Sequence, residues 1–208
     1  NKSASDPYLS KIICDFKESY AIGIQLARSV ELKNFTILGK FQFPYSVTNA
    51  NIGTLKFQDW ADAAMAEGIT DSRYAPYAGI SVDPLPNITG SGGSSDITFR
   101  NMAVKQFMVG IALTPNDSTL NDEMINIWDC DLEANRVDIA IGQDQSKTIS
   151  IKGLKAWASV HTILDGLTYG RGTGGGSVFC ENWNIAGNVN QLFNLNTDRF
   201  PLSCMNLY

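Results

Sequence analysis

Short segments in which apolar and polar residues strictly alternate recur along the chain. They begin at Val30, Ile97, Ile125, Ile149 and Val178, and the last four starts are spaced by 28, 24 and 29 residues. Alternation with a period of two indicates a β-strand with one buried face. The chief departures are Trp128 and Phe179, which place an aromatic ring at a position expected to face outward.

Each alternating segment ends in a residue of one chemical kind. The fifth position is Asn34, Asn101, Asp129, Gly153 or Asn182, and an apolar residue follows three positions later. Asn, Asp and Gly are the residues that best tolerate the left-handed backbone conformation. The pattern therefore predicts a sharp bend at the same point of every repeat.

A second apolar segment follows the first strand of each repeat. These second strands are expected at residues 21–26, 108–113, 137–142, 161–164 and 191–195. In the repeats that start at 97, 125, 149 and 178, they follow after about a dozen residues, which is too short for a crossover helix. Repeats of this length with short strands indicate a β-solenoid. A β-sandwich would explain the alternation, but it would not explain Asn, Asp or Gly at a fixed offset.

The segments "YAIGIQLARSVELKNFTILGKF" and "INIWDCDLEANRVDIAIGQDQSKTISIKGLKAW" resemble rungs of the right-handed parallel β-helix, the pectate-lyase-like fold. Pectin-degrading enzymes share that fold with phage tailspikes and other receptor-binding proteins. The resemblance covers residues 11–45 and 96–196 and implies an all-β solenoid of about six rungs, with a homotrimer if the tailspike class applies. The Asp and Arg motifs of pectate lyases and polygalacturonases do not form a clear local pattern here.

The rung pattern is interrupted between residues 46 and 95, which we expect to be one large insertion in a single domain. This segment includes a helix-like piece from Phe57 to Glu67, and a smaller Gly-rich excursion is expected at residues 167–177. Residues 197–208 are expected to form a C-terminal cap. Since the sequence begins at Asn1 rather than Met, we expect it to be part of a longer chain.

Composition narrows the class of protein. Hydrophobic residues make up 44% of the 208 residues, charged residues 18%, and the net charge is −5. This composition is typical of a folded core and argues against binding to a nucleic-acid backbone. No apolar run approaches the ~18 residues of a membrane span. The single histidine, His161, excludes a metal site built from several histidines.

The cysteines bear on where the protein is assembled. Cys180 falls at an inward position, and Cys14 and Cys130 lie in or beside rung strands. We expect free, buried thiols that act as small apolar residues. Such thiols suit assembly in a reducing cytoplasm, as for virion proteins.

Acidic residues supply the candidates for catalysis. Glycoside hydrolysis needs two carboxylates, one acting as an acid and the other as a base or nucleophile. Asp131 and Glu133 could face out beside Glu181 of a later rung, with Asp144 as a further candidate, whereas Asp129 occupies the bend and is expected to be structural. Asp71 and Asp83 in the insertion are additional candidates. No cofactor is expected, although calcium binding by the same carboxylates is an alternative.

Aromatic and basic residues supply the candidates for sugar binding. The outward positions after the first strand read Lys33, Arg100, Trp128, Lys152 and Glu181. A tryptophan among mixed charges is a plausible platform for a sugar, because apolar sugar faces stack on aromatic rings. Arg73, Tyr74 and Tyr77 in the insertion form a second candidate surface.

Three functions remain open at this point. The first is a tailspike-like protein of the virion surface that binds, and could also depolymerise, a polysaccharide of the host cell surface. The second is a secreted polysaccharide lyase or glycoside hydrolase, and the third is a structural or adhesive solenoid without catalysis. The fold alone does not choose among them.

Overall fold

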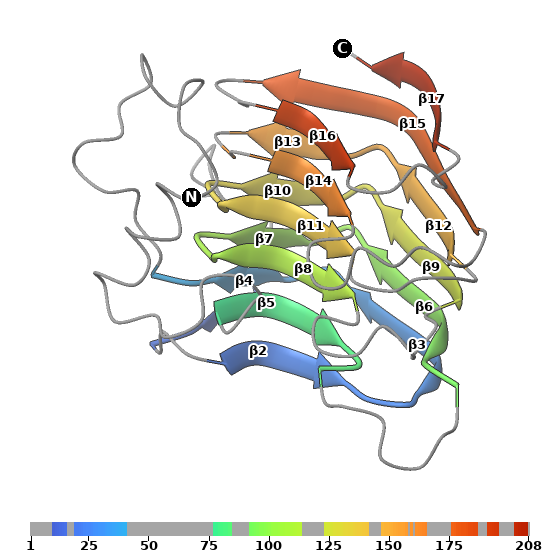
Figure 1. Ribbon diagram of the computed structural model, residues 1–208. Helices are drawn as coiled ribbons and strands as arrows, with labels where there is room; N and C mark the ends of the chain where they lie inside the picture. Colours follow the sequence, from blue (N-terminus) through green and yellow to red (C-terminus); the bar gives the residue numbers. More distant parts are fainter. Residues whose placement is uncertain are drawn as a thin grey trace.

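The fold is a stack of parallel strands. The computed structural model describes residues 10–15, 19–40, 77–84, 92–113, 123–141, 147–157, 159, 161–165, 176–186, 191–195 and 202–207. These ranges form 17 β-strands and contain no helix. Every strand pairs in parallel with the equivalent strand of a neighbouring coil, so successive coils stack from β2 and β3 at one end to β15 and β17 at the other (Figure 1). The predicted all-β parallel β-helix is therefore confirmed.

Each coil contributes one strand to each of three sheets, which we name A, B and C. Along the chain the strands follow in the order C, A, B. Sheet C contains β3 (Arg28–Lys33), β6 (Ser95–Arg100), β9 (Glu123–Trp128), β12 (Lys147–Lys152), the first part of β15 (Gly176–Ala186) and β17 (Leu202–Leu207). Sheet A contains β1 (Lys11–Ile13), β4 (Thr36–Leu38), β7 (Ala103–Lys105), β10 (Asp131–Glu133), β13 (Lys155–Trp157) and the end of β15. Sheet B contains β2 (Ser19–Ile24), β5 (Tyr77–Val82), β8 (Val109–Leu113), β11 (Val137–Ile141), β14 (His161–Asp165) and β16 (Gln191–Leu195).

The repeat in the sequence corresponds to this architecture. The predicted first strands lie in sheet C, and the predicted second strands lie in sheet B. The apolar residue three positions after each bend lies at the centre of a short strand of sheet A. These central residues stack in register as Ile37, Val104, Leu132, Ala156 and Ile185.

The predicted bends all adopt the left-handed conformation. The φ angles at Asn34, Asn101, Asp129, Gly153 and Asn182 lie between 53° and 66°, and Asn206 adds a sixth bend with a φ angle of 53°. At both ends of the stack the bends are tied by side-chain amides. Asn101 Nδ2 donates to Asn34 Oδ1 at 2.7 Å, and Asn206 Nδ2 donates to Asn182 Oδ1 at 2.9 Å.

The bend at Gly153 lies close to the side chain of the preceding bend. A Cβ atom at Gly153 would lie 2.3 Å from Oδ1 of Asp129 in the preceding coil. A larger residue would require the Asp129 carboxylate to move, so glycine leaves room for aspartate at the neighbouring bend.

Inward residues form ladders along the core of the solenoid. One ladder runs through Ile97, Ile125, Ile149 and Val178, all fully buried. The next contains Phe99, Ile127, Ile151 and Cys180, of which none is more than 1% exposed. Burying one such side chain contributes about 1.5–3 kcal/mol, so the ladders are the main source of stability.

The expected boundaries need three corrections. Tyr77–Val82, which we placed in the insertion, form β5 and pair with both β2 and β8. Leu202–Leu207, which we placed in the cap, form β17 and extend sheet C. The coils with three separate strands begin at β3, β6, β9 and β12, giving about four turns, slightly fewer than the six rungs expected. The helix-like piece at 57–67 lies outside the described residues, as does the Gly-rich excursion before Gly176.

All four cysteines are free thiols, as expected. Cys14, Cys130 and Cys180 are buried, and Cys204 is exposed. Burial raises the pKa of Cys130 to about 12, so its thiol stays protonated at neutral pH.

Replacing Ile127 with Asp should unfold the solenoid. The side chain is completely buried in the inner ladder, where a carboxylate would have no partner. We expect a loss of more than about 4 kcal/mol in the free energy of unfolding, measured by chemical denaturation followed by circular dichroism. Met124→Asp on the same strand is the control, because Met124 is 54% exposed and has a left-handed φ angle of 55° that Asp tolerates. If both variants denatured like the wild type, the inward register would be wrong.

Candidate functional site

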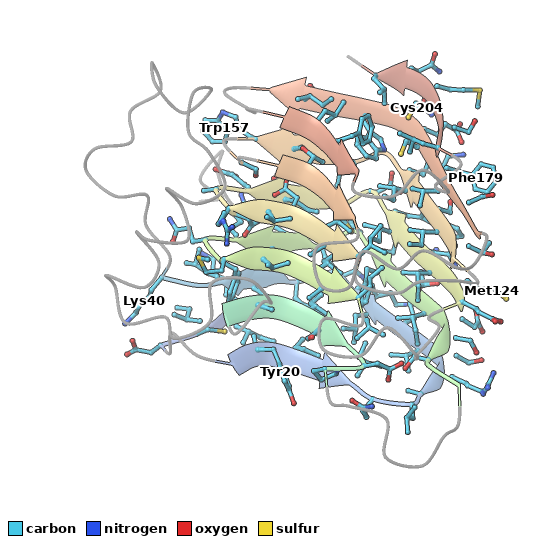
Figure 2. All side chains as sticks on the ribbon, viewed as in Figure 1. Tyr20, Lys40, Met124, Trp157, Phe179 and Cys204 are labelled. Carbon is cyan, nitrogen blue, oxygen red and sulfur yellow. The ribbon has the colours of Figure 1, made fainter. Side chains whose placement is uncertain are left out.

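Sheet C presents the exposed outward face of the solenoid. The outward residues Lys105 on sheet A and Ala112 on sheet B are buried, although sheet A also has exposed residues near its ends, Ile13 and Trp157. On sheet C, by contrast, Arg100 and Lys152 are exposed and Phe179 is 49% exposed. Figure 2 shows Phe179 and Met124 projecting from this side of the stack, whereas Trp157 of sheet A lies on the opposite side. A ligand would therefore find accessible side chains on sheet C.

The predicted outward row is confirmed by the strand register. Lys33 pairs with Arg100, Arg100 with Trp128, Trp128 with Lys152, and Lys152 with Glu181. Neighbouring strands lie ~4.8 Å apart, so consecutive side chains in the row are neighbours on the surface.

Trp128 lies at the centre of this row between two ion pairs. Arg100 binds Glu31 at 2.5 Å on one side, and Lys152 binds Glu181 at 3.1 Å on the other. The indole Nε1 donates to Ser150 Oγ at 3.1 Å, which fixes the direction of the ring. Together these contacts hold both cations and the ring in place.

A shallow pocket lies at this point of the row. It has a volume of about 350 Å³ and is lined by Arg100, Trp128, Asp129 and Lys152. The row thus brings three predicted sugar-binding residues together at one pocket, with the bend residue Asp129 at its edge.

Charge around Trp128 is balanced. The cations Lys33, Arg100 and Lys152 are matched by the anions Glu31, Asp129 and Glu181. The pKa of Glu31 is lowered, first by the hydrogen bond from Lys33 and then by Arg100 and the charge of both cations. The face therefore offers paired donors and acceptors rather than a field of one sign.

Of the predicted catalytic residues that the structure describes, Glu181 lies apart from Asp131 and Glu133. Glu181 lies on sheet C, whereas Asp131 and Glu133 lie on sheet A, beyond the bend. Both of these carboxylates contact the buried Lys105, Glu133 at 2.5 Å and Asp131 at 3.5 Å. Lys155 Nζ also contacts Asp131, at 3.4 Å.

This second cluster has the character of a buried ion-pair network. The side chains of Lys105, Asp131 and Glu133 are only 8%, 12% and 14% exposed. Removing one partner of such a network leaves an uncompensated buried charge, so its members depend on one another for stability. The catalytic role predicted for Asp131 and Glu133 stays a prediction, and their environment favours a structural role.

The remaining candidates are placed only in part. Arg73, Tyr74, Asp71 and Asp144 lie outside the described residues, and of Tyr77 only the backbone, at the start of β5, is described. Asp83 is fully buried and has a left-handed φ angle of 47°. Its carboxylate accepts hydrogen bonds from the backbone N–H groups of Leu26 and Ser94 and from the Ser94 hydroxyl. It joins two coils at the turn between sheets B and C.

Sequence reasoning missed a second buried carboxyl group, Asp138 of β11. Its Oδ1 accepts hydrogen bonds from Asn135 Nδ2 at 3.0 Å and Ser159 Oγ at 2.7 Å, and all three residues are fully buried. Desolvation raises the pKa of Asp138 well above its ordinary value and outweighs these hydrogen bonds. The only signal in the sequence is an aspartate within the apolar segment "VDIAI".

Comparison with family models, curated proteins and solved structures found no match in any of the three. No helix among the described residues is long and apolar enough to cross a membrane. Within the same part of the chain, no three His, Cys, Asp or Glu residues are grouped so that they could hold a metal ion. Calcium binding stays a prediction.

Replacing Asp138 with Asn should change how stability depends on pH. Because the pKa of Asp138 is higher in the folded than in the unfolded protein, its contribution is full below the unfolded pKa and is lost as pH rises toward the folded pKa. The free energy of unfolding of Asp138→Asn minus that of the wild type should therefore increase with pH, by up to about 1.4 kcal/mol per unit. Urea denaturation between about pH 4 and pH 8 measures this difference, and a constant difference would show that Asp138 is ionised in the fold.

Proposed function

We propose that this chain is a carbohydrate-binding parallel β-helix, and that the outward face of sheet C binds a polysaccharide of a cell surface. The observation that carries the proposal is the Trp128 ring, held between the Glu31–Arg100 and Lys152–Glu181 ion pairs at the rim of a pocket. The tailspike-like location on a virion and the homotrimer belong to the same proposal, and they rest on the resemblance of the rung sequences.

The chemistry of this face suits a sugar. One side of a pyranose ring is covered by C–H groups and packs on an aromatic ring, whereas its edge carries hydroxyl groups. Flanking ion pairs supply charged donors and acceptors for those hydroxyls, and hydrogen bonds to charged groups are the stronger ones. Binding sites commonly combine an aromatic surface with a few fixed polar groups in this way.

Binding without cleavage is better supported than depolymerisation. Among the described residues, Glu181 is the predicted catalytic residue on this face, and it is engaged by Lys152. Asp131 and Glu133 lie on another sheet, where Lys105 holds both carboxylates. A glycosidase needs two carboxyl groups that both reach the bond to be broken, about 5–10 Å apart. The two carboxylates near the Trp128 pocket are the bend residue Asp129 and the Lys152 partner Glu181, and these positions favour structural roles for both.

Replacing Trp128 with Ala should weaken polysaccharide binding at least about tenfold, because a contact of this size is worth at least about 1.4 kcal/mol. The probe is a panel of purified bacterial capsular and O-antigen polysaccharides, immobilised and tested by biolayer interferometry against the intact protein. Met124→Ala is the matched control, since Met124 is an exposed residue on the same strand.

The outcomes separate the three candidate functions. Retention of a polysaccharide that Trp128→Ala loses and Met124→Ala keeps supports the proposal. Release of new reducing ends or unsaturated sugars during the assay would indicate a depolymerising enzyme instead. If no polysaccharide of the panel were retained, or if Trp128→Ala bound like the wild type, the proposed site would be rejected.

A further inference from the structure

We infer that the face of sheet C carries a second aromatic subsite at Phe179, and that it binds an uncharged polysaccharide whose chain lies along the axis of the solenoid. The inference rests on the proposed function and goes beyond it, because it names the second contact, the direction of the chain and the charge of the ligand.

The position of Phe179 is the first step. It occupies an outward position of β15, and about half of its surface is exposed. An exposed phenylalanine is unusual there, because the outward positions of the repeat are mostly polar. Its register partners on the two neighbouring strands are Ser150 and Ser203. Serine side chains are too short to cover the ring, so one aromatic surface stays open to a ligand.

Ser150 connects this ring to the first subsite. The same serine hydroxyl accepts the hydrogen bond from Trp128 Nε1, at 3.1 Å. The indole therefore reaches from its own position in the outward row toward the row that contains Ser150 and Phe179. Both rings consequently flank one serine, Trp128 from the β9 side and Phe179 from the β15 side.

The direction of the ligand follows from the strand order. β9, β12 and β15 are consecutive in the stack, so the two aromatic residues are two strand spacings, or roughly 10 Å, apart along the solenoid axis. A polysaccharide that lies along that axis places sugar rings over Trp128 and Phe179. Between these two rings it crosses β12, where Ser150 and Lys152 face outward. A chain laid along the strands would meet only one of the two rings.

The charge of the ligand follows from the balance of charges. Each cation beside Trp128 already has a carboxylate partner, and Asp129 adds another negative charge at the pocket. An anionic polysaccharide would have to displace Glu31 and Glu181 to gain contacts with Arg100 and Lys152. An uncharged polysaccharide can use both members of each ion pair as they stand.

The test uses the uncharged polysaccharide retained in the panel, cut to oligosaccharides of increasing length, with the intact protein and two variants. Phe179→Ala should weaken binding of long oligosaccharides about tenfold and leave the shortest bound ones unchanged, because the latter fill only the Trp128 subsite. Trp128→Ala should weaken both. Met205→Ala is the control for Phe179→Ala, because Met205 is 60% exposed on the next strand of sheet C.

Two further measurements complete the test. Affinity should change less than about twofold when salt is raised from about 0.05 to 0.5 M, since no net charge is neutralised. Light scattering should give the same molar mass for Phe179→Ala and the wild type.

Each contrary result has its own meaning. If Trp128→Ala lost binding while Phe179→Ala bound every length normally, the second subsite would be refuted and the proposed function retained. A panel in which only anionic polysaccharides bind, or a steep loss of affinity with salt, would refute the uncharged ligand. A smaller molar mass for Phe179→Ala would show that Phe179 contacts a second copy of the chain instead.

Discussion

The left-handed residue that ends each strand of sheet C sets the cross-section of every coil. An ordinary L-residue in that conformation costs roughly 1–2 kcal/mol, and Asn, Asp and Gly reduce the cost. The bend directs the chain into sheet A so that the residue three positions later returns to the same ladder in each coil. If one bend opened, the inward and outward positions that follow would no longer match their neighbours. The outward row from Lys33 to Glu181 therefore depends on the left-handed bends that follow it in each coil.

The strands of sheets B and C could be predicted because each is long enough to show a pattern, and because the bends use residues with a known backbone preference. Sheet A could not be predicted as a separate sheet, because each of its strands other than β15 has only three residues, too few to show alternation. β5 was missed because its segment lacks the offset residue and lies in the long gap between two recognised repeats. Other left-handed positions, such as Gln106 and Ala134, gave no signal because these residue types have no preference for that conformation.

The candidate site was also predictable only in part. Trp128, Arg100 and Lys152 could be brought together from the sequence, because strand register alone makes them neighbours. Alternation also assigned Asp131 and Glu133 to outward positions, but an outward position is exposed only if nothing covers the sheet. Their side chains are buried with Lys105. Burial at an outward position depends on the side chains that pack beside it, such as Lys105 here, and a repeat pattern carries no information about that.

The aromatic residues at outward positions of sheet C are the feature that points to a binding role. Folding gains little from an aromatic ring that stays half exposed, so the stability of the solenoid does not explain Phe179. Trp128, the other aromatic residue at an outward position, is partly buried and contributes to packing as well. Local choices that disagree with the rest of a sequence tend to mark functional sites. The hydrogen bond to Ser150 fixes the direction of the indole, which would reduce the entropy lost if a sugar binds there as proposed. Recognition by preformed rings on a regular stack would thus follow from the same repeat that builds the core.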